Sequence, residues 1–381
     1  MLTRREFLPL AAGSTLLTAS TLLAADAGPG SVMPTIGKVT DNPLPTNGVV
    51  TSGHYVPPYR FGLGGVAAGN GFAAMSDEAA ESLMEASWAA GVRYFDTSPW
   101  YGLGLSERRF GRFLHNHKPD DYVISTKIGR ILKATKTPPK ALWQEPSPFS
   151  YTYDYTAEGT RRSIEDSLQR LGVSQIDIVF IHDLSPDNED MKERWTEYFD
   201  IAQKGAMPEL TRMREEGIIK AWGFGVNRPE PALRAVEVAD PDIFLLACQY
   251  SLIDHEQAVE KTFPVLEKKG VSVVVGAPLV AGYLAGRDRY LYSGTVPDGA
   301  AQKRDKLTKV ATDFGIDLRT ASLQFAAASK IVSAIIPGAR TAEQVKANVD
   351  SMKVMIPTSF WDELRKQGLI SKAATTPDAT T

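Results

Sequence analysis

Eight short apolar segments recur along the chain, and stretches with helical spacing of apolar residues separate them. The segments are residues 60–64, 92–96, 122–126, 176–181, 219–225, 243–247, 271–275 and 333–336. Alternating strands and helices are typical of parallel sheets, because a parallel strand needs a long crossover before the next one. Eight such units over roughly 300 residues match a (β/α)8 TIM barrel. A doubly wound open sheet is the alternative, and the even spacing favours the barrel.

Capping residues support the helices between these strands. Ser76 and Thr341 each precede a first turn that contains an acidic residue, which is the pattern of a helix N-terminus. Residues 157–171 carry apolar side chains at helical spacing. The sequence therefore predicts helices that begin near 77, 157 and 342.

The first 27 residues have the composition of an export signal. Arg4 and Arg5 precede an apolar stretch, and small residues surround Ala27. The arginine pair resembles the twin-arginine class of signals. The stretch holds five Ser and Thr residues and is short for a membrane span. We expect a signal peptide over 1–27, cleaved after Ala27 or retained, that directs the protein through the twin-arginine machinery to the periplasm without a stable membrane anchor.

Composition divides the rest of the chain into a linker, a barrel and a tail. Residues 28–57 are rich in Gly, Pro, Thr and Asn and predict an extended linker, while 373–381 predict a flexible tail. The barrel is expected over 58–372. The net charge of −3 argues against a nucleic-acid partner. One cysteine, Cys248, and five scattered histidines predict neither an intramolecular disulfide nor a metal site.

Polar residues stand where the predicted strands end. In a barrel of this kind, catalytic groups lie at the C-terminal ends of the strands. Five strand ends carry such a residue, namely Asp96, Lys127, His182, Asn227 and Gln249. The sequence therefore predicts that these side chains meet at one end of the barrel.

Tyr101 completes a possible proton-transfer group with Asp96, Lys127 and His182. A tyrosine ordinarily titrates near pH 10, and a nearby ammonium lowers its pKa. Lys127 would supply that charge, with Asp96 as its counter-ion, while His182 would orient a substrate oxygen. Such a tyrosine exchanges a proton with a carbonyl or hydroxyl oxygen while the carbon exchanges a hydride with a nicotinamide. Taken singly, each residue is explained as well by a structural ion pair or a buried core group.

The segments around these residues resemble the aldo-keto reductase superfamily. The motifs are Gly91-Val-Arg-Tyr-Phe-Asp96-Thr-Ser-Pro-Trp-Tyr101, Ser125-Thr-Lys127, Ile176-Asp-Ile-Val-Phe-Ile-His182, Gly223-Phe-Gly-Val-Asn227 and Ile336-Pro-Gly-Ala-Arg340. The resemblance covers residues 60–369 and implies a (β/α)8 barrel with a catalytic tetrad of Asp96, Tyr101, Lys127 and His182.

Further motifs resemble one branch of that superfamily, which includes D-threo-aldose 1-dehydrogenase (L-fucose dehydrogenase) and pyridoxal 4-dehydrogenase. They are Tyr153-Asp-Tyr155, Val274-Val-Gly-Ala-Pro278 and Trp361-Asp-Glu-Leu364. The resemblance implies oxidation of a ring hemiacetal hydroxyl to a lactone, with NAD or NADP as hydride acceptor. A broad aldehyde or ketone reductase, a cofactor-sensing regulatory barrel and a sugar-binding protein remain alternatives.

The resemblance also implies a cofactor site. Asn227 and Gln249 would hold the nicotinamide carboxamide. The loop after the seventh strand and the start of the last helix would contribute Pro278, Leu279, Gly338, Arg340, Gln344 and Asn348. Gly338 stands where many members carry a lysine, so Arg340 is the candidate contact for a 2′-phosphate, and both NAD and NADP remain open.

Two tryptophans and one long loop are candidates for the substrate pocket. Trp100 and Trp143 would form its walls, since sugars often lie on aromatic faces, although packing explains them equally well. Residues 129–155 contain four prolines and no clear periodicity, which predicts a long loop that covers the site. The expected partner is therefore a small molecule, an aldose or an aldehyde.

Overall fold

The computed structural model describes residues 32, 34–48, 53–292 and 294–377. Residues from 32 onward form one compact unit, and the expected signal peptide lies outside the described residues. Among the described residues, no helix combines the length and the apolar character that a membrane span requires.

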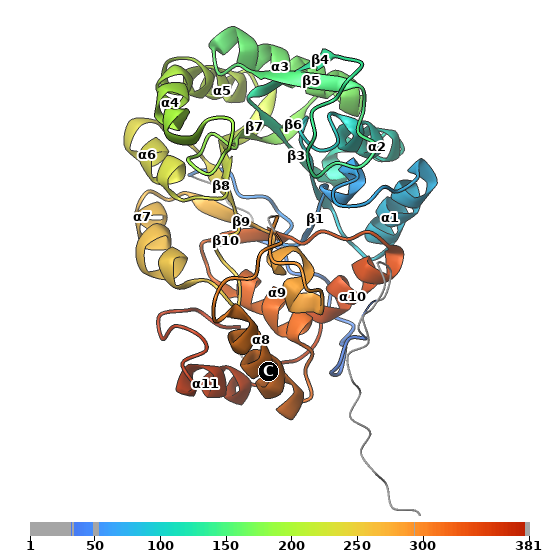
Figure 1. The fold of residues 1–381 in the computed structure, drawn as a ribbon, viewed down its shortest axis with the longest axis vertical. Coiled ribbons are helices and arrows are strands. Elements are labelled where there is room, and N and C mark those ends of the chain that lie inside the picture. Colours follow the sequence, from blue (N-terminus) through green and yellow to red (C-terminus); the bar gives the residue numbers. More distant parts are fainter. Residues whose placement is uncertain (1–31, 33, 49–52, 293, 378–381) are drawn as a thin grey trace, which may run out of the picture. The chain divides into compact units, whose positions relative to one another are not determined.

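Eight parallel strands form the barrel of this unit (Figure 1). In order around the sheet they are β1 (Gly62–Gly64), β2 (Tyr94–Asp96), β3 (Val123–Ile128), β6 (Ile176–His182), β7 (Ile219–Val226), β8 (Ile243–Ala247), β9 (Ser272–Gly276) and β10 (Val332–Ile336). Parallel bridges from Phe61 to Ile335 and from Gly64 to Gly338 close the ring. The predicted (β/α)8 barrel is confirmed, and each of the eight predicted segments forms a strand.

Helices surround the strands as an outer ring (Figure 1). They are α1 (Asp77–Ala89), α2 (Leu105–Leu114), α3 (Ala157–Leu171), α4 (Trp195–Lys204), α5 (Ala206–Glu215), α6 (Glu230–Val238), α7 (Phe263–Lys268), α8 (Ala300–Asp313), α9 (Leu318–Ala328), α10 (Ala342–Met352) and α11 (Thr358–Lys366). Short turns are η1 (Ala67–Gly69), η2 (Pro119–Asp121), η3 (Lys192–Arg194), η4 (Ala258–Thr262) and η5 (Val280–Ala285). Both predicted caps form, since Ser76 Oγ accepts from Ala79 N and Thr341 Oγ1 accepts from Gln344 N.

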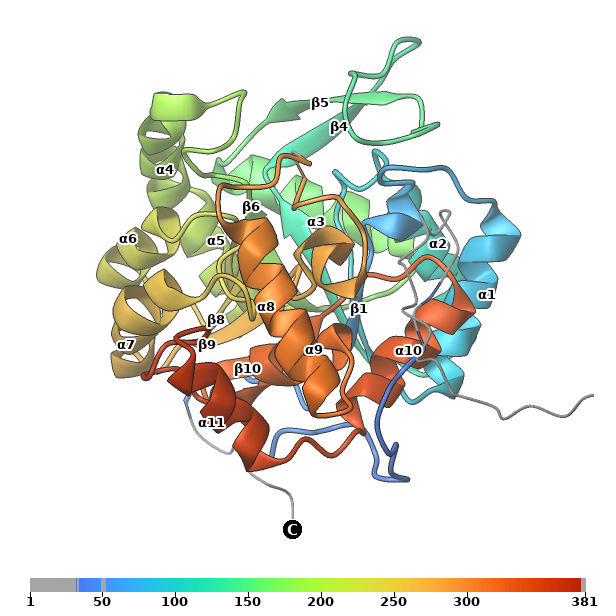
Figure 2. The ribbon, with the colours of Figure 1, turned by 60° about the horizontal axis from the view of Figure 1, so that its bottom comes forward.

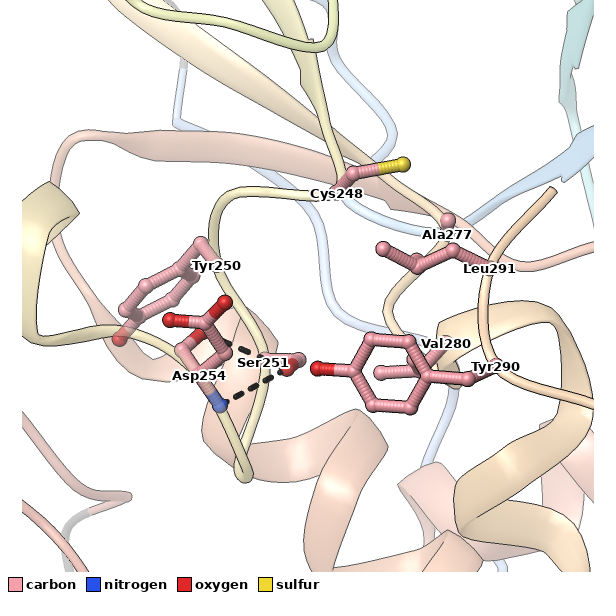
Figure 3. A pocket seen from close by; sticks show the side chains of 8 residues that line it. All are labelled: Cys248, Tyr250, Ser251, Asp254, Ala277, Val280, Tyr290 and Leu291. Atoms are coloured by element: carbon pink, nitrogen blue, oxygen red, sulfur yellow. Dashed lines mark hydrogen bonds between the residues drawn. The ribbon is translucent and has the colours of Figure 1, made fainter. Parts of the chain in front are cut away.

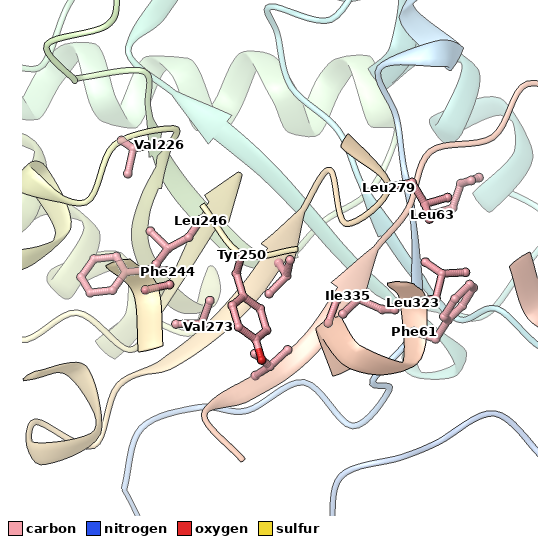
Figure 4. Packing of buried hydrophobic residues seen from close by; sticks show 14 of the residues in the cluster. Phe61, Leu63, Val226, Phe244, Leu246, Tyr250, Val273, Leu279, Leu323 and Ile335 are labelled. Atoms are coloured by element: carbon pink, nitrogen blue, oxygen red, sulfur yellow. The ribbon is translucent and has the colours of Figure 1, made fainter. Parts of the chain in front are cut away.

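Alternate residues of each strand pack on opposite faces of the sheet. Inside the barrel, Ile178 and Phe180 of β6 pack with Tyr94 and Val274 from other strands. The outward residues join the larger core beneath the helices, part of which Figure 4 shows. This period of two is the one expected of strands that are buried on both faces.

A two-stranded antiparallel hairpin interrupts the predicted loop 129–155. It pairs β4 (Arg130–Ala134) with β5 (Phe149–Tyr153), and Figure 2 shows it at the top of the view. The loop prediction was therefore incomplete, because the prolines lie between the two strands and only five residues form each strand. The hairpin fixes the aromatic residues of β5 near the strand ends of the barrel.

The two ends of the described chain are tied to the barrel by individual hydrogen bonds. Within the expected linker, Asn47 Nδ2 donates to Ser333 O over 2.8 Å, and Ile36 N donates to Asp317 Oδ2 over 2.9 Å. In the expected tail, Arg365 Nη2 donates to Thr376 Oγ1 over 2.8 Å and Ala374 is buried. Both segments are irregular, as their composition suggests, but their described parts are packed against the body.

His255 ties the loop after β8 to the C-terminal segment and gives a prediction for stability. Its side chain is fully buried, with Nδ1 3.1 Å from Ser251 O and Nε2 accepting from Ser371 N over 3.0 Å. Burial lowers the pKa of His255. As the pH falls, the imidazole of His255 takes up a proton in the unfolded state before it does so in the folded state. The contribution of neutral His255 to the free energy of unfolding is therefore complete above about pH 6.5 and is lost as the pH falls toward the folded-state pKa.

We therefore expect the free energy of unfolding of the wild type to fall more between about pH 7.5 and about pH 5.5 than that of a His255→Gln variant. One proton sets a limit of about 1.4 kcal/mol per pH unit. Urea unfolding at the two pH values measures this difference. Equal pH dependence of the two proteins would show that His255 binds a proton equally well when folded.

Candidate active site

Lys127 and Asp96 form a buried ion pair between β3 and β2. Lys127 Nζ donates to both carboxylate oxygens of Asp96 over 2.9 Å and to Thr97 O over 2.7 Å. Ser125 Oγ donates to Asp96 Oδ1 over 2.7 Å. Burial lowers the pKa of Lys127 and raises the pKa of Asp96, while the attraction between them opposes both shifts. Each ammonium proton therefore has an acceptor, as a buried ion pair requires.

Tyr101 lies against this pair. Its side chain is buried, and Lys127 Nζ lies 4.7 Å from the centroid of its ring. The loop after β1 packs closely against the backbone of Tyr101. A Cβ on Gly69 of that loop would lie only 2.5 Å from this backbone, so the approach requires glycine. The glycine-rich end of the first strand thus positions the tyrosine.

The protonation state of Tyr101 differs from the expectation. Burial, followed by the negative charge of Asp96, raises the pKa of Tyr101 well above its ordinary value, and the charge of Arg130 opposes this. The expected lowering of this pKa is not found in the structure, where burial and nearby negative charge act in the opposite direction. Tyr101 is therefore a neutral phenol at neutral pH, ready to donate a proton.

His182 ends β6 beside the tyrosine. The two ring centroids are 5.9 Å apart, and Ser98 Oγ lies 3.2 Å from His182 Nδ1. Burial, then the charges of Lys127 and Arg130, lower the pKa of His182 well below its ordinary value. The imidazole is therefore neutral at neutral pH. The structure brings together all four residues of the predicted tetrad.

Aromatic side chains from the hairpin and neighbouring loops line the approach to Tyr101. The rings of Trp100 and Trp143 meet edge to face at 5.5 Å, and the ring of Trp143 is 5.7 Å from that of Tyr101. Tyr151 of β5 packs 5.0 Å from Trp100. Trp143 therefore packs against Tyr101 of the tetrad, and Trp100 packs against Trp143.

An arginine and an aspartate beside the tetrad were missed by the sequence reasoning. Arg130 Nη1 donates to Asp183 Oδ2 over 2.8 Å, and Asp183 Oδ1 lies 3.5 Å from His182 Nε2. The guanidinium stacks against Trp100 and Tyr153, with centroids at 4.6 and 5.0 Å. Arg130 Nε is buried and has no hydrogen-bond partner among the described residues. The available signal was position, because Asp183 follows His182 and Arg130 lies just beyond β3.

The predicted nicotinamide contacts lie at neighbouring strand ends. Asn227 follows β7 and donates through Nδ2 to Asp187 Oδ2 over 3.1 Å, while Gln249 Nε2 lies 3.4 Å from Val226 O. Both amides are partly exposed. The predicted Pro278 and Leu279 follow β9 and are buried.

A small pocket opens between the loops that follow β8 and β9 (Figure 3). Its lining consists of Cys248, Tyr250, Ser251, Asp254, Ala277, Val280, Tyr290 and Leu291. Because the loops after β8 and β9 also carry Gln249 and Leu279, the pocket borders the predicted nicotinamide end of the site.

The predicted adenosine end lies at the start of α10. A Cβ on Gly338 would meet nothing within 4 Å, so this position is open. Asn348 Nδ2 lies 3.4 Å from Gly338 O, and Gln344 Oε1 accepts from Arg340 N over 2.8 Å. The Arg340 guanidinium donates to three carbonyl oxygens of the loop after β1, namely those of Gly71, Ala73 and Ala74. To contact a phosphate, the Arg340 guanidinium would have to give up some of its hydrogen bonds to these carbonyl oxygens.

Two further arginines gather near Arg340. Burial, then the charges of Arg287 and Arg340, lower the pKa of Arg289, and burial, then the charge of Arg287, lower the pKa of Arg340. Both Arg287 and Arg289 lie in the loop after β9, and neither was among the predicted cofactor residues. Repulsion between like charges is relieved by a bound anion.

The parallel barrel and its buried Asp–Lys–Tyr–His site define an oxidoreductase that combines proton and hydride transfer. The model of the "Aldo/keto reductase family" matches residues 60–368. The chain belongs to the aldo/keto reductase family, which confirms the resemblance inferred from its motifs.

Two relatives are similar over nearly their whole lengths. D-threo-aldose 1-dehydrogenase of Pseudomonas sp is 33% identical, and the alignment covers 84% of this chain and 96% of the relative. Pyridoxal 4-dehydrogenase of Microbacterium luteolum is 36% identical, with 81% and 94% covered. The expected branch is thus represented among its relatives.

Solved structures share the fold. An aldo-keto reductase from Bacillus halodurans in its holo form has a TM-score of 0.62 at 23% identity, covering 89% of this chain and 100% of that one. An aldo/keto reductase from Klebsiella pneumoniae in complex with NADP and acetate has a TM-score of 0.59 at 17% identity, covering 84% and 95%.

Proposed function

We propose that the protein transfers a hydride between a nicotinamide cofactor and C1 of a small aldose of the D-threo-aldose or L-fucose type. The observation that carries this proposal is the buried Lys127–Asp96 pair, which packs against Tyr101 beside a neutral His182. The two relatives with aldose and pyridoxal dehydrogenase names support a substrate with an aldehyde or hemiacetal carbon.

In the proposed oxidation, the phenolate form of Tyr101 takes the proton of the ring hemiacetal hydroxyl, a hydride leaves C1 for the nicotinamide, and the product is a lactone. A bound NAD or NADP supplies the hydride acceptor. His182 donates a hydrogen bond to the substrate oxygen, and Lys127 stabilises negative charge near Tyr101. Because burial raises the pKa of Tyr101, we expect oxidation to quicken with rising pH and the reverse reduction to proceed at neutral pH.

The residues at the two ends of the predicted cofactor site fit a dinucleotide. Asn227 and Gln249 offer amides for the carboxamide, and the arginine cluster of 287, 289 and 340 offers charge for phosphates. The N-terminus of α10 adds the positive end of a helix dipole, which favours an anion. Since Arg340 lies at the adenosine end, the structure supports NADP at least as well as NAD.

Arg340 gives a prediction about cofactor choice. We expect Arg340→Ala to weaken NADP binding by about tenfold, because one charge-assisted hydrogen bond is worth roughly that factor, and to leave NAD binding nearly unchanged. Fluorescence titration with each cofactor measures the effect, with Arg340→Lys as the matched control. Equal weakening of both cofactors would show that Arg340 acts through the loop at residues 71–74 instead.

A substrate panel tests the proposed function. We expect L-fucose, D-arabinose or pyridoxal to reduce NAD or NADP in the presence of the wild-type protein. Turnover of none of them, with either cofactor, would overturn the aldose proposal.

A broad aldehyde or ketone reductase is the second candidate, because the neutral phenol of Tyr101 is in the form that reduction needs.

We also propose that residues 1–27 direct export by the twin-arginine route to the periplasm, with the cofactor already bound. The arginine pair Arg4 and Arg5 supports this. Cell fractionation should find the wild type in the periplasm and a variant with Arg4→Lys and Arg5→Lys in the cytoplasm. A wild type that stays in the cytoplasm would overturn the proposal.

A further inference from the structure

We propose that Ser98 is a positioning residue that fixes the tautomer of His182, with the proton on Nε2 and the lone pair on Nδ1. The inference rests on the proposed function, in which His182 donates a hydrogen bond to the substrate oxygen. Ser98 lies in the turn after β2, between Asp96 and Tyr101, and was not among the predicted site residues.

The contacts of the Ser98 hydroxyl determine where its proton lies. Ser98 is fully buried, and its Oγ accepts from Trp100 N over 3.0 Å while lying 3.2 Å from His182 Nδ1. A hydroxyl has one proton to donate and two lone pairs that accept. Among the described residues, Nδ1 of His182 is the acceptor available to that proton. Ser98 therefore donates to Nδ1, which must then be unprotonated.

The opposite tautomer leaves a buried polar group without a partner. If Nδ1 carried the proton, it would donate to Ser98 Oγ, and the hydroxyl proton of Ser98 would have no acceptor among the described residues. An unmade hydrogen bond on a buried group is costly. Since His182 is held neutral by burial and by the charges of Lys127 and Arg130, only one ring nitrogen carries a proton.

The surroundings of Nε2 select the same tautomer. Asp183 Oδ1 lies 3.5 Å from Nε2, and the negative charge of a nearby carboxylate favours a proton on that nitrogen. Arg130 holds the other oxygen of Asp183 over 2.8 Å, which fixes the carboxylate and offsets its charge. Tyr155 Oη donates to the His182 carbonyl oxygen over 3.2 Å and holds the end of β6 in place.

This arrangement reserves one nitrogen for the substrate. Nδ1 is occupied by the turn that carries Ser98 and Trp100, so Nε2 is the nitrogen left to contact a ligand. In its protonated form, Nε2 presents a donor to the oxygen that gains negative charge during hydride transfer. Because Trp100 N is bonded to the same hydroxyl, Ser98 also couples the histidine to the predicted wall of the substrate pocket.

Nitrogen-15 NMR of the imidazole rings in the full chain tests the proposal without any turnover. The five histidines are distinguishable once a His182→Gln variant identifies the signal of His182. We expect the wild type to show the tautomer with the proton on Nε2. Ser98→Ala should add a population with the proton on Nδ1, and Ser98→Thr, which keeps a hydroxyl, should restore the wild-type pattern.

In activity measurements, we expect Ser98→Ala to lower kcat by roughly tenfold, the scale of one lost hydrogen bond, and to leave cofactor affinity unchanged. A wild type with the proton on Nδ1, or a tautomer unaltered by Ser98→Ala, would overturn the role of Ser98. The tautomer shift without turnover of any substrate would count against the proposed function and leave the role of Ser98 standing.

Discussion

A Tyr101→Phe variant is expected to lose turnover by a factor of about 10² to 10⁴, the range that a positioned acid or base contributes. The substitution removes the one hydroxyl that exchanges a proton with the substrate and keeps the ring that packs against Lys127 and Trp143. Stability and cofactor affinity should therefore stay close to those of the wild type. Steady-state kinetics and cofactor titration measure the two parts.

Tyr151→Phe is the matched control, since its ring lines the same approach but its hydroxyl bonds Asp190. We expect this variant to keep kcat within a few-fold of the wild type. Full activity of Tyr101→Phe would instead support the regulatory barrel, in which the cofactor is bound but the tetrad does no chemistry.

Breaking the buried ion pair should have the second largest effect. We expect Lys127→Met to abolish activity and to destabilise the protein by about 3 to 5 kcal/mol, because it leaves Asp96 buried without a counter-charge. Asp96 is 1% exposed, so water cannot compensate it. Chemical unfolding and initial rates measure the two effects.

The double variant Asp96→Asn with Lys127→Met separates stability from catalysis. It removes both charges, so much of the lost stability should return, yet activity should remain absent. If the Lys127→Met variant were as stable as the wild type, Asp96 and Lys127 would not form an ionised pair in the folded protein. An active double variant would show that the pair serves the fold alone.

Local spacing was sufficient to predict the barrel and to place polar residues at its strand ends, while the resemblance to a known family supplied the catalytic tetrad. The strands are short apolar segments that end in polar residues, so Asp96, Lys127 and His182 could be placed at strand ends before any contact was known. The motif that contains Tyr101 lies directly after the second strand. These features depend on neighbours in the sequence and on the fixed geometry of a parallel barrel.

Contacts between distant segments could not be predicted in the same way. Arg130 and Asp183 are 53 positions apart, and only the fold brings them beside His182. The strands β4 and β5 are too short for a periodic signal. The pKa of Tyr101 depends on burial and on the opposing charges of Asp96 and Arg130, and neither burial nor these approaches are visible in the sequence.

The origin and destination of the transferred hydrogen test the central claim most directly. Wild-type protein would be incubated with L-fucose or D-arabinose deuterated at C1, together with NAD or NADP, and the nicotinamide and sugar products analysed by NMR. Hydride transfer predicts deuterium at C4 of the reduced nicotinamide and a lactone that has lost deuterium from C1. A folded, cofactor-binding protein that transfers no deuterium from either sugar would contradict the account.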